Sequence, residues 1–437
     1  MKVLDLIASS VLTITLQAWS PSAQAALDIQ HWTTAQGTEV YFVENHDLPI
    51  VDVSVNFPAG QAHDTVETSG VAALTHYLMT LGAGGLNEET ITNRFADIGA
   101  ILGGSFDADR ASFKLRTLTS EQEKALETFT TLLHRPDFPA VVLEREKSRV
   151  IAGIQEAEIE PDSIAKKTFM QAVYGMHPYS QDESGEVATI QSAQTADLRT
   201  FYEQHYAAKS AVIAMMGDLS VAQAHAIAEK LSDGLPQTHA VPPIAPVKPL
   251  RAPVMKQLPH PATQAHILLG QPGNKRGDPD FFPLYVGNYI LGGGGFVSRL
   301  TEEVREKRGL AYTVYSYFMP MAELGPFQIG LQTKKEQAQE ALQLVNATVR
   351  QFVEKGVTAQ ELQAAKDNLI GGFPLRIDSN NKILEYLNVI GFYKLPLDYL
   401  DSFNDNVRKV TAQQIHDAFQ RRVQPENFVT VIVGAEE

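Results

Sequence analysis

Both halves of the chain end in the same order of sequence patterns, which indicates an internal repeat. Residues 195–205 and 411–421 each begin with Thr-Ala and have amphipathic spacing, which predicts a helix that is N-capped by its first threonine. Residues 210–216 and 428–433 follow as mostly apolar runs, each succeeded by a glycine, and both predict strands. A chain that repeats this order predicts two copies of one fold.

The beginnings of the two halves support the same interpretation. Residues 39–43 and 51–55 in the first half, and 265–269 in the second, have strand-like alternation. Helices are predicted over 70–81 and 281–291. Because the strands alternate and do not interleave strictly with helices, we expect an α+β fold. It should consist of two homologous domains, each a mainly antiparallel sheet with helices packed on one face.

A proline-rich segment marks the predicted boundary between the domains. Residues 238–249 contain four prolines and follow neither a helical nor a strand period, so we expect an extended, semi-rigid linker. We therefore predict an N-terminal domain at 26–237, a linker at 238–255 and a C-terminal domain at 256–437.

The first residues predict export. A positive start at Met1-Lys2, a mostly apolar stretch at 7–19 and the small-residue pattern Ala23-Gln24-Ala25 are typical of a signal peptide, here at 1–25. The apolar stretch is shorter than the roughly 20 residues that span a bilayer, and an uncleaved N-terminal anchor is the alternative. With cleavage after Ala25 we expect a periplasmic or secreted protein with no membrane span.

Composition excludes several classes of function. The sequence has no cysteine, which excludes disulfides, thiolate zinc sites and cysteine nucleophiles. The formal net charge is −15 and no basic cluster stands out, which argues against a nucleic-acid partner because phosphates would be repelled.

Four segments carry a family resemblance. They are the framework at 70–79, His177-Pro178-Tyr179, and the segments 291–300 and 305–312 of the second half. Together they resemble the peptidase family of insulin-degrading enzyme, pitrilysin and mitochondrial processing peptidase, and the second-half segments are similar to its short bacterial branch. The resemblance covers nearly the whole chain after the signal segment, and it implies that two such chains close around a peptide.

The resemblance also identifies what is missing. Active members carry His-x-x-Glu-His on the first-domain helix, where two histidines bind zinc and the glutamate activates water. The matching positions here are Ala73, His76 and Tyr77, and neither a methyl group nor a phenol replaces an imidazole ligand. We expect no metal site and no cofactor in this chain. His76 is then expected to line a non-catalytic cleft, the alternative being a vestigial metal or proton-transfer role.

The third zinc ligand of the family is a glutamate on a later helix. By resemblance its position here is Gly153, which has no side chain to offer. Glu156 and Glu158 are the alternatives if the register differs by a few residues. Without the two histidines neither glutamate completes a zinc site, and both are expected to be solvated helix charges.

Substrate contacts are implied at two residues of the second half. In active members an arginine and a tyrosine hold the scissile carbonyl, and by resemblance these are Arg305 and Tyr312. A guanidinium and a phenol can both donate to the oxyanion that forms when water attacks a carbonyl. Arg308 competes with Arg305 for this role, and ordinary surface positions are the alternative for the pair.

Two glycine-containing segments are candidate peptide contacts. Gly103, Gly104 and Ser105 resemble the family's cleft-edge strand, to which an extended peptide can add through main-chain hydrogen bonds; a bulged edge strand is the alternative. Gly293 and Gly294 belong to a glycine run that lacks the Gly-Lys-Ser/Thr ending of a phosphate loop. A flexible substrate loop and a helix-ending turn are both open for that run.

Taken together, these features predict the zinc-free subunit of a heterodimeric metallopeptidase. The expected partner is a homologous subunit that holds zinc on an intact His-x-x-Glu-His motif, and the expected substrates are small unfolded peptides. The first alternative is a non-enzymatic peptide-binding or structural subunit of a periplasmic complex. The second is an independent enzyme with an unfamiliar metal arrangement.

Overall fold

The computed structural model describes residues 27–238 and 241–434. The predicted signal peptide at 1–25 lies outside the described residues, as do positions 239 and 240 of the predicted linker. Within the described ranges, no helix is both long enough and apolar enough to cross a membrane.

The first half folds around a six-stranded sheet with the order β1-β2-β8-β3-β7-β6. Neighbouring strands run antiparallel except β2 and β8, which run parallel, and β6 lies at one edge. A short β4–β5 hairpin lies outside this sheet. The strands are β1 (Gln30–Thr33), β2 (Glu39–Glu44), β3 (Ile50–Phe57), β4 (Gly82–Ala83), β5 (Leu86–Asn87), β6 (Ile101–Phe106), β7 (Ala111–Leu118) and β8 (Val212–Gly217).

The second half contains a five-stranded sheet with the order β11-β12-β10-β13-β9, again with one parallel pair, β9 and β13. This order repeats β6-β7-β3-β8-β2 of the first sheet, so β11 corresponds to β6. The α+β fold with mainly antiparallel sheets is therefore confirmed. The strands are β9 (Val254–Leu258), β10 (Gln264–Pro272), β11 (Thr313–Phe318), β12 (Pro326–Lys334) and β13 (Val429–Val433).

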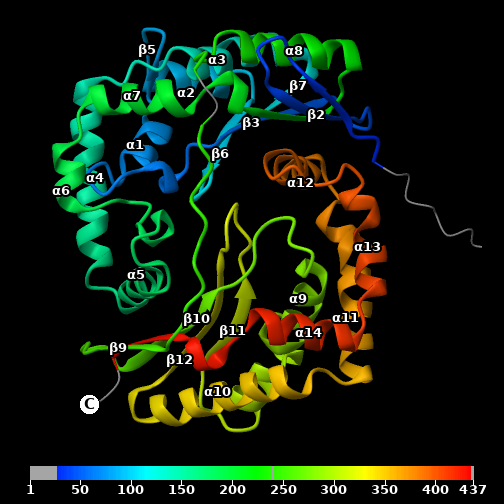
Figure 1. Ribbon diagram of the computed structural model, residues 1–437. Coiled ribbons are helices and arrows are strands. Elements are labelled where there is room, and N and C mark those ends of the chain that lie inside the picture. The colour runs from blue at the N-terminus through cyan, green and yellow to red at the C-terminus, as the bar shows by residue number, and fades with distance from the viewer. Residues whose placement is uncertain (1–26, 239–240, 435–437) are drawn as a thin grey trace, which may run out of the picture.

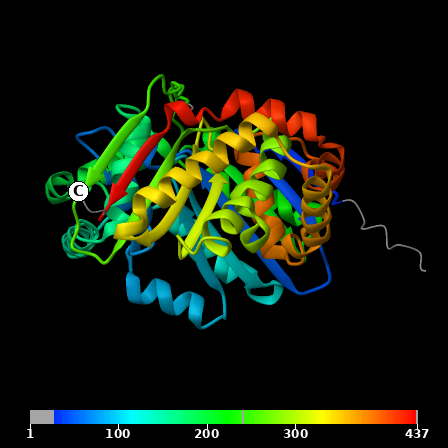
Figure 2. The same ribbon diagram turned by 90° about the horizontal axis from the view of Figure 1, so that it is seen from below.

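Helices cover the outer face of each sheet (Figure 1). Figure 2, seen from below, shows α10 and α14 lying across the second sheet. In the first half the helices are α1 (Val71–Leu78), α2 (Glu88–Ala96), α3 (Gln122–His134), α4 (Ala140–Ala157), α5 (Pro161–Tyr174), α6 (Val187–Ser192), α7 (Thr195–His205) and α8 (Val221–Asp233). In the second half they are α9 (Phe281–Asn288), α10 (Ala338–Lys355), α11 (Ala359–Gly372), α12 (Asn380–Phe392), α13 (Tyr399–Lys409) and α14 (Ala412–Arg422).

The two halves exchange a helix, which the sequence patterns did not predict. α5 of the first half packs through Phe169 on Leu268 and Val431 of the second sheet. α12 of the second half packs through Leu387 on Ala214 of the first sheet. Each sheet is therefore covered on its second face by a helix of the other half, and apolar burial joins the halves.

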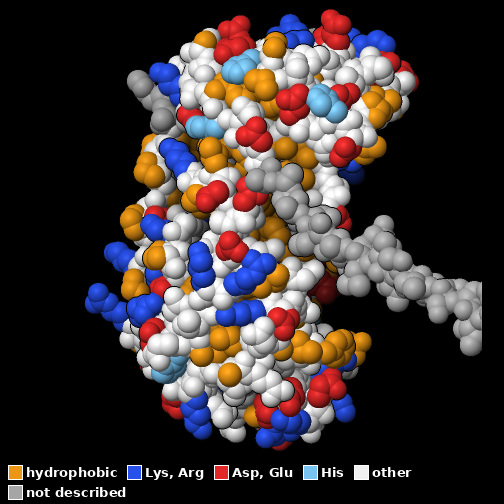
Figure 3. Space-filling model, turned by 90° about the vertical axis from the view of Figure 1, so that its right-hand side faces the viewer, with side chains coloured by type: hydrophobic (Ala, Val, Ile, Leu, Met, Phe, Trp, Pro, Cys, Tyr) orange, Lys and Arg blue, Asp and Glu red, His pale blue; other side chains and the backbone are white. Residues whose placement is uncertain are grey.

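The structure differs from the sequence predictions at one helix N-cap and at one helix end. Thr411 caps α14 as predicted, its side chain accepting a hydrogen bond from Gln414 N, whereas Gln194 rather than Thr195 occupies the N-cap of α7. The helix predicted to reach residue 291 ends as α9 at Asn288 and continues as a π-helical turn, Tyr289–Gly293. On the face shown in Figure 3, acidic and basic side chains are interspersed.

Candidate functional site

A cavity of about 270 Å³ lies along α1. Its other walls come from β6, from α4 and from the loop that precedes α6. The residues that line it are Gly70, Ala73, Leu74, His76, Tyr77, Phe106, Val150, Glu183 and Ser184. All three positions that match the family's zinc motif therefore face one cavity, as their spacing on a helix requires.

A buried carboxylate fixes the start of this helix. Gly70 precedes α1 in the left-handed region, with φ 92°, and Asp64 accepts hydrogen bonds from Gly70 N (2.9 Å) and Ala72 N (3.0 Å). A helix leaves such N–H groups without an internal partner. Burial raises the pKa of Asp64 to about 7, although the two N–H groups oppose the rise. Asp64 thus holds the first turn of α1.

His76 is held against the first sheet. Its Nε2 lies 3.0 Å from the carbonyl oxygen of Ser112 on β7 and donates to it. The ring packs against Phe113 and Phe106, with centroid separations of 4.7 and 5.6 Å. Burial lowers the pKa of His76, so its ring is neutral at neutral pH. These contacts favour a structural role for His76 over a metal or proton-transfer role.

The remaining motif positions offer no zinc ligand. Ala73 ends in a methyl group, and Tyr77 is 45% exposed at the mouth of the cavity. Gly153 on α4 faces open space, because a Cβ built there meets nothing within 4 Å. Among the residues that the structure describes, no group of three or more His, Asp or Glu side chains is placed to hold a metal ion. The residues present therefore do not fit the zinc that the family motif would hold.

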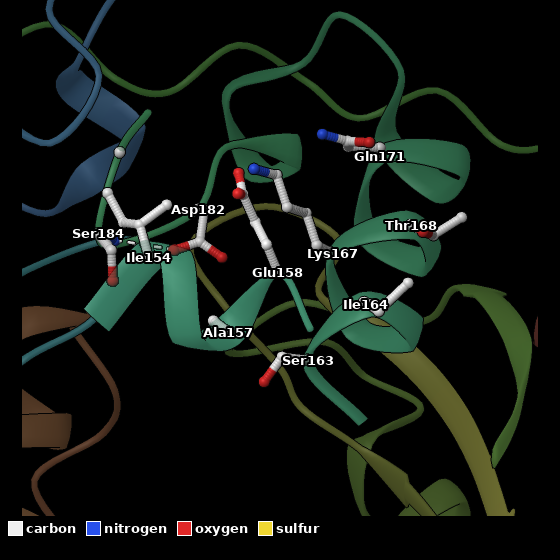
Figure 4. A pocket seen from close by; sticks show the side chains of 11 residues that line it. Ile154, Ala157, Glu158, Ser163, Ile164, Lys167, Thr168, Gln171, Asp182 and Ser184 are labelled. Atoms are coloured by element: carbon white, nitrogen blue, oxygen red, sulfur yellow. Dashed lines mark hydrogen bonds between the residues drawn. The ribbon is translucent and has the colours of Figure 1, made fainter. Parts of the chain in front are cut away.

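A second cavity, of about 180 Å³, lies between the end of α4 and α5 and shares Ser184 with the first. Figure 4 shows the side chains of Glu158 and Lys167 projecting into it. Lys167 also forms an ion pair with Glu186 at 2.9 Å. Glu158 thus lines this neighbouring cavity and not the one along α1, while Glu156 is exposed. Neither glutamate replaces the missing third ligand.

The segment Gly103-Gly104-Ser105 lies at the edge of the first sheet. β6 pairs continuously with β7 and shows no bulge, and no described strand pairs with its other side. A Cβ at Gly104 would lie 2.3 Å from Ser112 O, whereas Gly103 has open space. Gly104 is therefore required for close packing on β7. The outer edge of β6 is suited to an added peptide strand.

Arg305 and Tyr312 flank the turn that leads into β11. The Arg305 guanidinium carbon lies 4.9 Å from the ring centroid of Phe296, whose side chain is 68% exposed. Tyr312 is 71% exposed, and its N–H donates to Gln332 O at 2.9 Å. The main chain of Tyr312 is therefore fixed to β12 while its phenol extends outward.

The competing arginine is more constrained. Nη1 of Arg308 donates to the carboxylate of Glu303 at 2.9 Å and to its carbonyl oxygen at 3.1 Å. The nearest acid to Arg305 is Glu306, at 3.6 Å from Nε. Arg308 is the more exposed of the two arginines, at 46% against 38%, but it is held by Glu303, whereas Arg305 makes only the looser contacts with Glu306 and Phe296.

The glycine run ends α9 by close packing. A Cβ at Gly292 would lie 2.4 Å from Ser316 Oγ, one at Gly293 would lie 2.7 Å from Asn288 Nδ2, and one at Gly294 would lie 2.6 Å from Tyr289 O. A larger residue at Gly292 would push against β11, and larger residues at Gly293 and Gly294 would push against the preceding helical turn. This packing favours the helix-ending turn over a flexible loop.

The halves also meet at a buried carboxylate that no sequence pattern revealed. Asp109, in the β6–β7 turn, accepts hydrogen bonds from Tyr179 OH (2.6 Å), Tyr393 OH (2.8 Å) and Ala322 N (2.8 Å). Tyr179 OH in turn accepts from Glu323 N at 3.1 Å. Burial raises the pKa of Asp109, while its three donors oppose the rise. The only signal in the sequence was that Tyr179 lies in a segment of the family resemblance.

Known proteins are similar to this chain over nearly its whole length. Residues 39–185 match the family model described as Insulinase (Peptidase family M16), and residues 192–369 match the model described as Peptidase M16 inactive domain. The solved peptidase M16 inactive domain from Pseudomonas fluorescens is 37% identical, with a TM-score of 0.91 over 94% of this chain and 99% of that chain. The non-peptidase homolog YmxG of Helicobacter pylori is 27% identical over 97% of this chain and 98% of that protein. A solved protease from Helicobacter pylori, 17% identical, shares the fold with a TM-score of 0.87 over 93% of this chain and 99% of that chain.

Proposed function

Because this chain belongs to the insulinase family (peptidase family M16) and is a catalytically inactive member of it, we propose that it is the zinc-free subunit of a heterodimeric peptidase. The partner is a homologous chain that holds zinc on an intact His-x-x-Glu-His motif. The substrates are small unfolded peptides held between the two chains. Arg305 and Tyr312 contact the scissile carbonyl and the oxyanion that develops from it.

The observation that carries the proposal is a contrast between two parts of one chain. The positions that match the family's zinc motif hold a methyl group, an exposed phenol and a histidine that is hydrogen-bonded to Ser112 O. Arg305, by comparison, is half-exposed and lies over the exposed ring of Phe296, and Tyr312 is exposed. A guanidinium or phenol donor aimed at a developing oxyanion can lower an activation barrier by ~3 kcal/mol. Their exposure suits a contact with a second molecule.

Peptide binding in this proposal uses the edge of β6. Gly103, Gly104 and Ser105 offer main-chain groups to an extended peptide, which would continue the sheet by one strand. Gly293 and Gly294 contribute a wall of the substrate cleft. A strand added in this way needs no metal from this chain.

A non-enzymatic peptide-binding or structural subunit of a periplasmic complex is the second candidate function. It is supported by the description of the Helicobacter pylori relative as a non-peptidase homolog. The β6 edge would then hold a peptide or a neighbouring protein without any cleavage. An exported location, proposed from the segment at 1–25, applies to both candidates.

Mixing the purified chains tests the proposal. Hydrolysis of a quenched, unstructured peptide is measured with the mature chain alone, with a zinc-bearing partner alone and with the two together. We expect no hydrolysis by this chain and a rate for the mixture well above that of the partner. A mixture no faster than the partner would reject the proposal, and association of the two without stimulation would favour the binding subunit. Hydrolysis by this chain alone that a chelator abolishes would reveal a metal site.

A further inference from the structure

The cavity along α1 is lined by one charged side chain, the carboxylate of Glu183. Glu183 lies in the loop before α6 and is exposed at the rim of the cavity. Partial shielding from water, together with the charges of Asp182 and Asp107, raises the pKa of this carboxyl. Lys167, in the neighbouring cavity of Figure 4, pairs with Glu186 instead. No lysine or arginine occurs among the described residues that line the cavity, so Glu183 faces it without a cation.

His76 supplies a second acceptor in this lining. A carbonyl oxygen can only accept, so the bond to Ser112 O places the proton of the neutral ring on Nε2 and leaves a lone pair on Nδ1. Nδ1 of His76 has no hydrogen-bond partner among the described residues. Unlike Nδ1 of His205, it is not one of the fully enclosed unpaired atoms, so it is reachable.

The other walls of the cavity are mainly apolar. Leu74, Val150 and Phe106 form them, and the Tyr77 ring lies at the mouth. A volume of about 270 Å³ is just below the roughly 300–1,000 Å³ of common small-molecule sites, which suits one side chain of a larger ligand. Apolar walls with acceptors and no cation match a side chain that has an aliphatic stem and a donor-bearing cationic head.

The edge of β6 gives a peptide access to this cavity. A Cβ at Gly104 would lie 3.4 Å from His76 Nε2, so this face of β6 is turned toward α1. Phe106, two residues on, shares the face and lines the cavity. Side chains alternate along a strand, and directly opposite residues of neighbouring strands point to the same face. In a peptide strand added to β6, the side chain opposite Gly104 is therefore directed toward the cavity.

We propose that this cavity receives a lysine or arginine side chain of a peptide that adds to β6, with the cation paired to Glu183. The aliphatic stem lies on the apolar walls, and His76 Nδ1 is available as a second acceptor. The inference rests on the proposed function in that it assumes a peptide on β6, and it adds a preference for a basic residue at one position.

The test uses three capped peptides that differ only at one central residue, which is lysine, norleucine or glutamate. Norleucine has the four-carbon stem of lysine without the ammonium group. Dissociation constants for the mature chain without a partner are measured by NMR titration. We expect the lysine peptide to bind about threefold to tenfold more tightly than the norleucine peptide, because only lysine pairs with the carboxylate. The glutamate peptide should bind most weakly.

Two variants with the same change in net charge separate this pocket from general attraction to an acidic protein. Glu183→Gln keeps the shape of the side chain and should abolish the difference between lysine and norleucine. Glu89→Gln on exposed α2 is the matched control and should preserve it. Ala73→Met, which fills the cavity from α1, should also abolish the difference.

Equal affinities for the lysine and norleucine peptides, or no measurable binding of any of the three, would overturn the proposal. A preference that Glu183→Gln and Glu89→Gln reduce equally would overturn it as well, because net charge would then be the cause. A preference that survives Ala73→Met would place the lysine outside the cavity. Because binding is measured without the partner, its outcome is separate from the mixing experiment. Stimulation without a lysine preference refutes only this pocket, and preference without stimulation refutes only the peptidase subunit.

Discussion

His76 Nε2 lies 3.0 Å from the carbonyl oxygen of Ser112, so a residue of the zinc-motif helix is tied to the neighbouring sheet. The position that holds the water-activating glutamate in active relatives is therefore part of the packing between α1 and β7. Ala73 and Tyr77, one helical turn apart, still face the cavity, and Gly153 leaves room for a side chain. These three positions carry no zinc ligand, and a side chain introduced at Gly153 would meet no neighbour.

Restoring ligands should restore zinc binding. In Ala73→His/Tyr77→His/Gly153→Glu, two histidines at i and i+4 and one glutamate supply the three protein ligands of an open zinc site. We expect about one zinc per chain and a zinc-dependent rise in Tm, whereas the unmodified chain should show neither. Metal content and thermal unfolding with and without zinc measure this. The Ala73→His single variant is the control, and zinc binding by the unmodified chain would contradict our interpretation of the site.

Removing the proposed oxyanion donors should slow the partner's turnover. Arg305→Ala and Tyr312→Phe are each expected to lower kcat of the mixed peptidase about tenfold to a hundredfold, since each removes one donor. Arg308→Ala is the matched control, because Arg308 is held by Glu303. Association with the partner, measured by analytical ultracentrifugation, should not change. Unaltered kcat in both variants, or an equal loss in Arg308→Ala, would remove the assigned role.

Neighbouring glycines of β6 should respond differently to the same substitution. Gly104→Ala should lower the free energy of unfolding by about 1–3 kcal/mol, because its Cβ would lie 2.3 Å from Ser112 O. Gly103→Ala meets no atom within 4 Å and should have little effect. Urea unfolding of the two variants provides an internally matched comparison. Equal destabilisation would mean that β6 does not pack on β7 in this register.

Local patterns in the sequence were enough to predict most strands, but not what covers them. The runs that became β8 and β13 are mostly apolar on both faces, with Thr430 as the polar residue of β13, which is typical of strands buried on both faces. That pattern cannot say which helix supplies the second cover. Here α5 and α12 cross to the opposite half, and such a choice depends on contacts far apart in the chain.

β3 shows how a correct pattern can have an unexpected cause. Its alternation of valine with polar residues is typical of a strand with one face in water. Asp52 and Ser54 are instead buried, 2% and 0% exposed, and Asn56 Nδ2 on the same face donates to Asn388 Oδ1 of α12 at 2.8 Å. Asp52 is paired with Arg116 of β7 at 2.7 Å, so protein side chains and not water satisfy this polar face. An alternating pattern indicates that the two faces of a strand have different surroundings. It does not show whether the polar face meets water or polar groups of the protein.

For the candidate site too, the sequence predicted local arrangements but not contacts between distant segments. The motif spacing placed Ala73, His76 and Tyr77 on one cavity, because it depends only on helix geometry. The bond from His76 to Ser112 depends on where β7 passes the helix, and the choice between Arg305 and Arg308 depends on the contacts of Glu303. Both are tertiary facts that a local pattern does not contain.

A partly buried histidine pair should make stability depend on pH. The rings of His63 and His205 lie 5.0 Å apart; burial lowers the pKa of His63 to about 4, with the charge of His205 as a second cause. Because an unfolded histidine titrates near 6.5, the unfolded chain binds more protons between pH ~6.5 and 4. The stability contribution is full above that window and falls as the pH decreases through it.

Replacing His63 should therefore flatten the acid dependence. Relative to the unmodified chain, His63→Phe should gain up to about 3 kcal/mol between pH 7 and 4. Urea unfolding at several pH values measures the difference. His46→Gln is a control of opposite sign, since hydrogen bonds to Asp218 and Glu44 raise the pKa of exposed His46. Parallel pH curves for His63→Phe and the unmodified chain would contradict a lowered pKa of His63 in the folded chain.

Asp109, the carboxylate that joins the two halves, should contribute more to the free energy of unfolding than an acid on the surface. Asp109→Ala would leave the hydroxyls of Tyr179 and Tyr393 and the N–H of Ala322 without their acceptor, so we expect a loss of about 3 kcal/mol in unfolding free energy. Asp97→Ala, on the exposed end of α2, should change it by less than about 0.5 kcal/mol. Because Asp109 and Tyr393 touch, the double variant Asp109→Ala/Tyr393→Phe should lose less than the sum of the single losses. Urea unfolding of the unmodified chain, Asp109→Ala, Tyr393→Phe and the double variant measures this coupling. Strictly additive losses would mean that Asp109 and Tyr393 do not share a hydrogen bond across the halves.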